Sequence, residues 1–410
     1  MLVTRSERCL IKKSDPMWKT VDIYCQRANS VYNQANYFVR QWFINTGLWL
    51  RAQNLDKIMQ TTDCYYSLGT QSSQCTVRLI DKNWSGFFSA IKDWSRKKGV
   101  GYSGKPRLPG YKDKTGRSIL LLKPAQCCIK NKTIYFAWEP LRKFSGMKTN
   151  IDGRIIQTRF VPKGTCYWLE FVYETHTQEL KEKSNRVIGI DLGINNFATI
   201  ANNIGVTPII INGKNIKSMN QYFNKKKATI QSETRMSINN RIKNLTDKRI
   251  RKLDYFMHCA SKFVVEYCKE NSIDTIIIGK NNGWKNEVNM GHKNNQSFVN
   301  IPYDEFILKL KYKCINVGIN VIETEESYTS GTSFLDKEFP TKENYNKSRR
   351  KPRGMFTSNN GTKINSDLNG AYQIIRKVLP DAFEHRDRGW ALHPVRLTIS
   401  NKAYLNYRYA

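Results

Sequence analysis

Residues 186–202 read RVIGIDLGINNFATIAN, and this stretch decides the fold of the second half of the chain. Its two apolar runs flank Gly193–Asn196, where glycine and asparagine favour a tight turn. The pattern predicts a β-hairpin with its turn at these residues. Asp191 lies inside the first apolar run, where an unpaired carboxylate would be costly to bury.

The sequence after this hairpin predicts an ordered series of helices and strands. A basic stretch over 218–270 has the length of one or two long helices. Short buried strands are predicted at TIIIG (275–279) and NVIET (320–324), with a helix near 303–313 between them and another over 369–378. A hairpin followed by helices, strand, helix, strand and helix is typical of an RNase H-like α/β domain.

The first half of the chain has a different pattern. Residues 1–12 predict one strand, and apolar residues recur at helical spacings of three and four over 17–98. The segment GYSGKPRLPGYKDKTGR (101–117) predicts a loop, and short β-rich runs follow it, as in a small barrel. We therefore predict an α+β multidomain protein with a helical lobe inserted in a β-barrel. The predicted domains are a barrel of residues 1–16 and 99–183, a helical lobe of 17–98, and an α/β domain of 186–410.

The chain is strongly basic. Its 410 residues include 67 Lys and Arg against 34 Asp and Glu, which is a formal net charge of +33. This charge far exceeds what solubility requires and predicts a polyanionic partner. We favour nucleic acid over a membrane surface, because no apolar run approaches the roughly 20 residues of a spanning helix. The N-terminus has no apolar secretory segment, which predicts a cytoplasmic protein.

Cysteine spacing argues against one kind of metal site. The ten cysteines contain no C-x-x-C pair, and residues 315–410 contain no cysteine. A zinc ribbon needs two such pairs, so we expect reduced thiols and no zinc. IGIDLG is also similar to the first phosphate loop of actin-like ATPases, but the second Asp-x-Gly-Gly loop of that class is absent from the sequence.

Three carboxylates at predicted strand or helix boundaries are candidates for metal-dependent phosphodiester hydrolysis. Such chemistry needs carboxylates that converge from different elements, because each Mg²⁺ binds only a few protein oxygens. The candidates are Asp191, Glu326 after NVIET, and Asp367 ahead of the last predicted helix. Each has a structural alternative: a turn contact for Asp191, an N-cap for Asp367, and a solvated acidic face for Glu323, Glu325 and Glu326.

Four segments together resemble a known family. The RuvC-type motifs of TnpB proteins, the transposon-encoded OrfB family, are similar to GIDLGINNFAT (189–199), IIIGKNNGWKNEVN (276–289), ESYTSGTSFLD (326–336) and SDLNGAYQIIRK (366–377). That family consists of RNA-guided DNA nucleases and is related to compact type V CRISPR effectors. The resemblance implies a helical recognition lobe in a wedge-type barrel domain, followed by a RuvC nuclease domain. It also implies that Asp191 is the first catalytic carboxylate and Asp367 the last.

The middle glutamate departs from the commoner family pattern. In that pattern it ends the strand that reads TIIIG here, but Gly279 stands at this position. A subset of relatives carries the glutamate shortly before a Thr-Ser pair, and Glu326 matches this arrangement. The resemblance therefore implies Glu326 as the middle metal ligand, with Glu325 and Glu287 as alternatives.

The resemblance also implies ligands and partners. These are Mg²⁺ or Mn²⁺, as two ions bound by the three carboxylates, together with a guide RNA and target DNA. Where many relatives insert a zinc ribbon, this chain has a cysteine-free basic insert at about 331–360. Cationic and aromatic side chains in three segments are candidates to contact nucleic acid. They are Lys105, Arg107, Tyr111, Lys112, Lys114, Arg117, Lys225, Lys226, Lys227, Arg349, Arg350, Lys351 and Arg353.

The predicted function is RNA-guided DNA cleavage by a TnpB-type protein, acting as a monomer or dimer at the nucleoid of a prokaryotic cell. A compact type V CRISPR effector of the same lineage is one alternative, because the difference lies in the RNA. A nuclease-dead RNA-guided DNA-binding repressor is another, and Gly279 is the residue that supports it.

Overall fold

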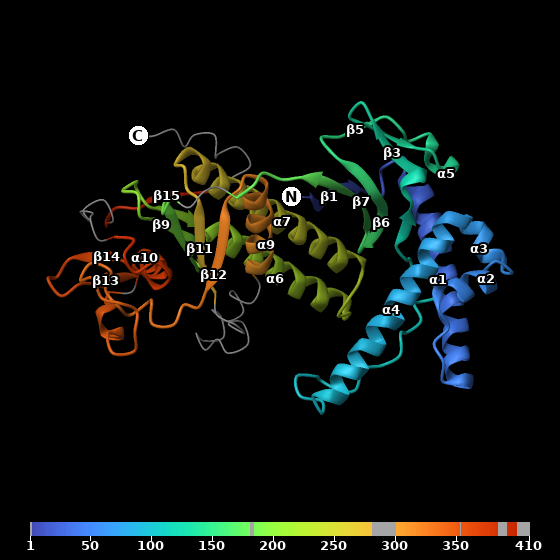
Figure 1. Ribbon diagram of the computed structural model, residues 1–410, viewed down its shortest axis with the longest axis horizontal. Coiled ribbons are helices and arrows are strands. Elements are labelled where there is room, and N and C mark those ends of the chain that lie inside the picture. The colour runs from blue at the N-terminus through green and yellow to red at the C-terminus, as the bar shows by residue number, and fades with distance from the viewer. Residues whose placement is uncertain (1, 181–183, 281–300, 353, 384–391, 400–410) are drawn as a thin grey trace. The chain divides into compact units, whose positions relative to one another are not determined.

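The computed structural model describes residues 2–180, 184–280, 301–352, 354–383 and 392–399 (Figure 1). The chain divides into two compact units, Leu2–His176 and Thr177–Ala410. No helix in these described ranges is both long and apolar enough to cross a membrane.

The strands of the first unit form two sheets. A four-stranded antiparallel sheet has the order β1-β7-β6-β2, and a three-stranded sheet has the order β3-β4-β5. Over the described residues the larger sheet is open, with β1 and β2 as its edge strands. β2 has only three residues, and strands β3–β5 pair with one another instead of closing the larger sheet. The strands are β1 (Leu2–Ile11), β2 (Leu120–Leu122), β3 (Cys127–Lys130), β4 (Thr133–Phe136), β5 (Met147–Lys148), β6 (Arg154–Lys163) and β7 (Cys166–His176).

Helices between β1 and β2 share one hydrophobic core with these sheets. Trp84 of the helices and Phe160 and Leu169 of the strands belong to the same buried cluster. The long helix α1 ends at Gly47, whose φ of 70° is a left-handed conformation that glycine adopts without strain. The helices of this unit are α1 (Trp18–Thr46), α2 (Ala52–Met59), α3 (Asp63–Leu68), α4 (Thr70–Arg96) and the short α5 (Glu139–Arg142), with a 3-10 turn at Pro124–Gln126.

The second unit is built on a six-stranded sheet with the order β12-β11-β8-β9-β10-β15. The predicted hairpin is β8 and β9, which pair antiparallel with Ile190 opposite Ile200. β10 continues this antiparallel meander, whereas β11 pairs parallel to β8, and β12 parallel to β11. The strands are β8 (Val187–Leu192), β9 (Asn196–Asn202), β10 (Ile209–Asn212), β11 (Thr275–Gly279), β12 (Asn320–Thr324) and β15 (Val395–Leu397).

Helices cover both faces of this sheet, with α7 and α9 on one side and α10 on the other (Figure 1). The predicted basic helical region is two helices, separated by Arg235 in a left-handed conformation. The Asn239 side chain caps the second of them by accepting from the Ile242 N–H. The helices are α6 (Lys214–Thr234), α7 (Asn240–Glu270), α9 (Tyr303–Asn316) and α10 (Ser366–Val378).

The described part of the basic insert forms a small substructure beside α10. A two-stranded antiparallel sheet joins β13 (Met355–Thr357) to β14 (Lys363–Asn365), after a 3-10 turn at Lys347–Arg349. Phe356 and Ile364 of this hairpin are buried in one cluster with Leu368 and Tyr372 of α10. The insert therefore leads directly into the helix that carries Asp367.

Candidate active site

Side-chain alternation on β8 directs Asp191 toward α10. Ile188, Ile190 and Leu192 belong to the cluster under α7 and α9, whereas Val187 belongs to the cluster under α10. Successive strand residues point to opposite faces, so Asp191 shares the face of Val187. The carboxylate thus faces the helix whose first turn contains Asp367.

Two glycines bring α10 close to this strand. A Cβ at Gly189 would lie 2.4 Å from the carbonyl oxygen of Ala371, and a Cβ at Gly370 would lie 2.7 Å from Oδ2 of Asp191. Real side chains do not tolerate such distances. The absence of a side chain at both positions therefore allows the helix backbone to approach β8 and places the Asp191 carboxylate against it.

Glu326 reaches the same place from the segment after β12. A Cβ at Gly279 would lie 2.4 Å from Oε1 of Glu326 and 2.5 Å from Cδ1 of Ile374. The Glu326 side chain therefore lies against the end of β11, next to α10. This is the strand end where the commoner pattern of the resembling family has its middle glutamate.

The three carboxylates influence one another electrostatically. Burial raises the pKa of Asp191 well above its usual value, and the negative charges of Glu326 and Asp367 raise it further, while Arg350 opposes the rise. Burial likewise raises the pKa of Glu326 to about 7, against the opposing charge of Lys377. Three acidic groups thus converge from β8, the segment after β12, and α10.

The alternatives for the middle carboxylate lie elsewhere. The Glu325 side chain is 65% exposed, with a carboxylate oxygen 3.9 Å from Nζ of Lys377, and it accepts a hydrogen bond from Ser327. Glu323 forms ion pairs with Lys280 and Lys311, at 3.4 and 2.5 Å. Glu287 lies outside the described residues. Of the glutamates compared, the structure brings Glu326 to the two aspartates.

Asp367 is not the N-cap of its helix. Asn365 is the cap, and its Oδ1 accepts from the backbone N–H groups of Asp367 and Leu368 at 3.0 and 3.2 Å. The Asp367 side chain is therefore available for another role, and its Oδ2 accepts a hydrogen bond of 2.7 Å from Nδ2 of Asn196. Arg396 in turn donates from Nη1 to Oδ1 of Asn196 at 2.7 Å.

Sequence reasoning did not identify Asn196, Arg396 or the glycines as parts of the site. Asn196 lies within the GIDLGINNFAT motif, but its residue type has no metal-ligand signal by itself. Arg396 lies 200 residues further along the chain, and only the pairing of β15 with β10 brings it near. No spacing rule links residues so distant in sequence.

The donor set fits hard divalent cations. Carboxylate oxygens are the preferred protein ligands of Mg²⁺ and Mn²⁺. The absence of a side chain at Gly370 leaves space beside the Asp191 carboxylate that a Cβ would fill. Within the described ranges, no group of three His, Cys, Asp or Glu side chains has the close spacing of a preformed metal site. Buried like charges repel one another, and a cation between them would offset that repulsion.

The cations of the loop at 101–117 have two different environments. Lys112 and Arg117 are bound within their own unit: Lys112 donates to Oγ of Ser118, and Arg117 donates to both carboxylate oxygens of Asp22. The Asn33 and Asn36 side chains donate to carbonyl groups of this loop. The exposed candidates in the loop are Lys105, Arg107, Tyr111 and Lys114.

The other candidate cations are similarly divided. Arg349 donates to both carboxylate oxygens of Glu338, at 2.7 and 2.8 Å, so it stabilises the insert from within. Its neighbour Arg350 instead acts electrostatically on Asp191. The exposed candidates here are Lys225, Lys226 and Lys351; Lys227 is half-buried, and Arg353 lies outside the described residues.

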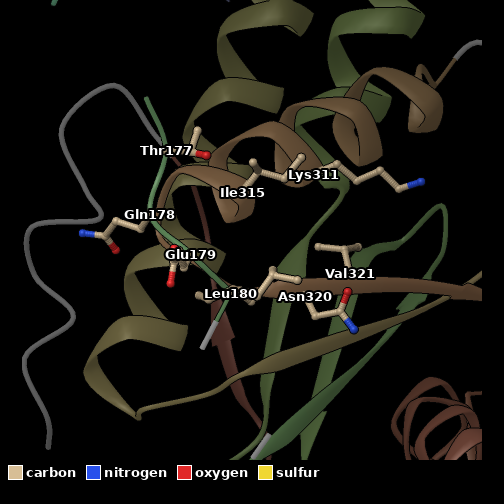
Figure 2. A pocket seen from close by; sticks show the side chains of 9 residues that line it. Thr177, Gln178, Glu179, Leu180, Lys311, Ile315, Asn320 and Val321 are labelled. Atoms are coloured by element: carbon tan, nitrogen blue, oxygen red, sulfur yellow. The ribbon is translucent and has the colours of Figure 1, made fainter. Parts of the chain in front are cut away.

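A cavity of about 570 Å³ lies at the other end of β12 (Figure 2). Its lining includes Leu180, Ile315 and Ile319, together with Asn320, which begins the strand that Glu326 follows. None of the three carboxylates lines this cavity. The acidic site is therefore a separate place on the sheet, at the carboxyl ends of its parallel strands.

Comparisons with known proteins relate the chain to one group. Residues 170–285 match the family described as probable transposase, OrfB_IS605, and residues 303–374 match the Cas12f1-like TNB domain. The TnpB-like protein ORF457 of Acidianus two-tailed virus is 24% identical over 400 residues, which cover 85% of this chain and 81% of that protein.

Solved structures of type V effectors also resemble the chain. The Cas12f1-sgRNA-target DNA complex covers 92% of this chain and 100% of its own, at 15% identity and a TM-score of 0.39. CasPhi-2 (Cas12j) bound to crRNA and phosphorothioate-DNA covers 94% and 93%, at 11% identity and a TM-score of 0.37. From the two family matches and the viral relative, the chain is a TnpB-type relative of the type V effectors.

Proposed function

We propose that this protein is an RNA-guided DNA endonuclease of the TnpB type. The observation that carries the proposal is the convergence of Asp191, Glu326 and Asp367: the charges of the other two act on Asp191, although the three come from different elements. The kinship with TnpB-type proteins supports a nuclease that works with RNA and DNA.

The strand order supports an RNase H-like, RuvC-type nuclease domain over residues 186–410. Three antiparallel strands, β10-β9-β8, are followed across the sheet by β11 and β12, which run parallel to β8. The acidic residues lie at the carboxyl ends of the parallel strands, where α/β sheets commonly bind ligands. We assign residues 17–98 to a recognition lobe, and 1–16 with 99–183 to the wedge.

The three carboxylates would hold two Mg²⁺ or Mn²⁺ ions. When bound, such ions activate the attacking water and stabilise the leaving oxygen of the phosphodiester. The chain's own contribution is to hold the carboxylates together: Gly370 leaves room for Asp191, Gly279 leaves room for Glu326, and Asn196 donates to Asp367. Arg350 adds a positive charge beside Asp191, where a phosphate is expected.

Guide RNA and target DNA account for the net charge of +33. In this mode of recognition the protein holds a heteroduplex by its backbone, and base pairing supplies the sequence. We assign phosphate contacts to the exposed cations Lys105, Arg107 and Lys114 in the loop, and Lys225 and Lys226 on α6. Lys112, Arg117 and Arg349 contribute instead to the fold, through their contacts inside the chain.

A compact type V CRISPR effector is the second candidate, and the match of residues 303–374 to the Cas12f1-like TNB domain favours it. A nuclease-dead repressor loses its main support, because Glu326 lies where the missing side chain at Gly279 leaves space. The TnpB protein and the CRISPR effector would both act as a monomer or dimer in the cytoplasm, at the nucleoid. Neither requires zinc.

One experiment tests both the proposed cleavage and the origin of the guide RNA. The protein is purified from its native locus, the bound RNA is sequenced, and DNA matching that RNA is offered with Mg²⁺. We expect cleavage by the wild type and none by Asp191→Ala or Asp367→Ala, with target binding retained. An RNA from a transposon end means a TnpB protein, and a repeat-derived RNA means a CRISPR effector. Cleavage that resists a chelator, or that survives in Asp367→Ala, would overturn the active site.

A further inference from the structure

Three side chains from distant parts of the sequence form a chain of hydrogen bonds that ends on a proposed metal ligand. Arg396 on β15 donates from Nη1 to Oδ1 of Asn196 at 2.7 Å. Asn196, the first residue of β9, donates from Nδ2 to Oδ2 of Asp367 at 2.7 Å. Asn196 is only 8% exposed, so both contacts are shielded from solvent on the asparagine side.

The chemistry of the two ends permits only one orientation of the amide. A guanidinium group has donors and no acceptor, and an ionised carboxylate has acceptors and no donor. The Asn196 oxygen must therefore face Arg396, and its NH₂ group must face Asp367. If Arg396 were absent, the Asn196 oxygen would lose its charged donor, and only the bond to Asp367 would hold the amide in place.

We propose that Arg396 and Asn196 are positioning residues that orient the Asp367 carboxylate for metal binding, a role that rests on the function proposed above. Asn196 holds Oδ2, which leaves Oδ1 and the second lone pair of Oδ2 for a cation. Arg396 acts through Asn196 by holding the amide oxygen, which restrains the side chain that donates to Asp367. Outer hydrogen-bond partners of this kind tune metal affinity by roughly 10- to 100-fold.

The position of the pair in the fold agrees with this role. A Cβ at Gly193, in the turn between β8 and β9, would lie 4.0 Å from Oδ2 of Asp367, so the carboxylate rests against the turn that follows Asp191. Tyr303 donates from its hydroxyl to the carbonyl oxygen of Gly193 at 2.9 Å and so anchors the same turn to α9. β15 contributes Arg396 from beyond the antiparallel strand β10.

The test compares Asn196→Ala, Arg396→Ala and Arg396→Lys with the double variant Asn196→Ala/Arg396→Ala. Thr398→Ala is the matched control, because Thr398 lies just after β15 and its polar contact, 3.3 Å from Nδ2 of Asn212, does not lead to the carboxylates. Each protein is studied as its RNA complex. Two quantities are measured: the Mg²⁺ concentration for half-maximal cleavage of saturating DNA, and the binding of Mn²⁺ followed by electron paramagnetic resonance.

We expect Asn196→Ala to raise the half-saturating metal concentration by about 10-fold or more in both measurements, with target affinity unchanged. Arg396→Ala should show a smaller rise, and Arg396→Lys should reverse most of it, since an ammonium also donates to Oδ1. The double variant should match Asn196→Ala, because Arg396 acts through that residue. Thr398→Ala should match the wild type.

Several outcomes would overturn the proposal. If the effects of the two single substitutions multiply in the double variant, Arg396 acts on the nucleic acid directly. If Asn196→Ala leaves the metal requirement unchanged, Asn196 has only a structural role. If the wild-type complex never cleaves DNA, the proposed function fails, but Mn²⁺ binding still measures the effect of Asn196 and Arg396 on the metal site. The two kinds of failure can therefore be told apart.

Discussion

At the scale of single residues, Glu326 and Gly279 form a complementary pair. The carboxylate of Glu326 fills the space that a side chain at position 279 would take. A glutamate cannot occupy both strand ends, because the two side chains would collide. The glycine at position 279 therefore leaves room for the Glu326 carboxylate, which we propose as the middle metal ligand.

The first prediction concerns this glutamate. We expect Glu326→Gln to lower the cleavage rate by roughly two orders of magnitude at matched target binding, because an amide is a poorer ligand for a hard cation. Glu325→Gln and Glu287→Gln should cleave near the wild-type rate. Single-turnover cleavage at saturating DNA measures the three. Full activity in Glu326→Gln with loss in either of the others would overturn the assignment, and full activity in all three would mean an unrecognised ligand.

The second prediction concerns stability at the same site. Burial and two neighbouring carboxylates raise the pKa of Asp191, which means that its ionised form destabilises the metal-free fold. We expect Asp191→Asn to raise the thermal midpoint in a chelating buffer at pH 8, by a few degrees for roughly 1 kcal/mol. Added Mg²⁺ should stabilise the wild type more than the variant. A variant that melts below the wild type in chelator would contradict the argument.

At the scale of elements, the contact between α10 and β8 depends on glycine. Gly189 faces the carbonyl oxygen of Ala371 and the side chain of Ile375. A Cβ at position 189 would lie 2.4 Å from that oxygen, so there is no room for a methyl group. The helix carries Asp367 and the strand carries Asp191, so any separation of these elements also separates the two aspartates. Fold and site thus depend on the same contact.

The third prediction follows from that contact. We expect Gly189→Ala to lower the free energy of unfolding by about 1–3 kcal/mol through overpacking, and to reduce cleavage as well. Gly86→Ala is the control, because Gly86 is an exposed position of α4 whose Cβ would meet no atom within 4 Å. There alanine should stabilise by up to about 1 kcal/mol through helix propensity. Urea unfolding of both variants distinguishes the two effects, and equal stability of the two would contradict the packing argument.

A second element-scale contact connects α1, the loop at 101–117 and β7. Asp22 accepts two hydrogen bonds from Arg117, at 2.9 and 2.8 Å, and one of 2.5 Å from the hydroxyl of Tyr167. The hydrogen bonds from Arg117, and then that from Tyr167, lower the pKa of Asp22 against the opposing effect of burial. A lowered pKa means that the folded state favours the ionised carboxylate.

The fourth prediction is the pH dependence of that contact. Because the pKa of Asp22 is lower in the folded state, its stabilisation is complete above the unfolded value near 4 and is lost as the pH falls through the folded value. We expect Asp22→Asn to be less stable than the wild type by about 2 kcal/mol at pH 7, and the difference to shrink below pH 4. Urea titrations across this range measure it. A difference that stays constant into acid would mean that charge plays no part.

At the scale of the whole molecule, the cationic side chains fall into two groups. Some cations are bound inside the chain, as Arg349 is to Glu338 and Lys112 is to Ser118. Others, such as Lys225 and Lys226 on α6, are exposed. Net charge alone predicts the class of partner, but it does not say which side chains bind that partner.

The fifth prediction separates these two groups. We expect replacement of Lys225, Lys226 and Lys227 by Gln to weaken RNA binding, and to reduce the slope of log affinity against log salt by about 0.7–0.9 for each lysine that binds a phosphate. Lys112→Gln is the matched control, and it should leave the slope unchanged, because its ammonium lies 4.1 Å from the ring centroid of Tyr32 within the fold. Filter binding at several salt concentrations gives both slopes. An unchanged slope in the triple variant would mean that these lysines face only solvent.

The sequence by itself predicted several elements of the second unit and the position of two acidic residues at element ends. TIIIG and NVIET became β11 and β12 with the predicted bounds, because short apolar runs between turn signals have few other ways to bury themselves. The motifs around Asp191 and Asp367 likewise indicated acidic residues at element ends. The helix over 369–378 begins earlier than predicted, at Ser366, because the cap is Asn365.

Only the tertiary structure decided which glutamate joins the two aspartates and which polar residues orient them. Glu325 and Glu326 are neighbours in sequence, and a slip of one residue would exchange the faces to which they point. The packing of α10 against β8 and β11 removes that ambiguity, because it leaves space beside Gly279 for one carboxylate. Asn196 and Arg396 meet only because β15 joins the sheet beside β10. Local sequence determines which elements form, whereas contacts between distant residues depend on how those elements pack.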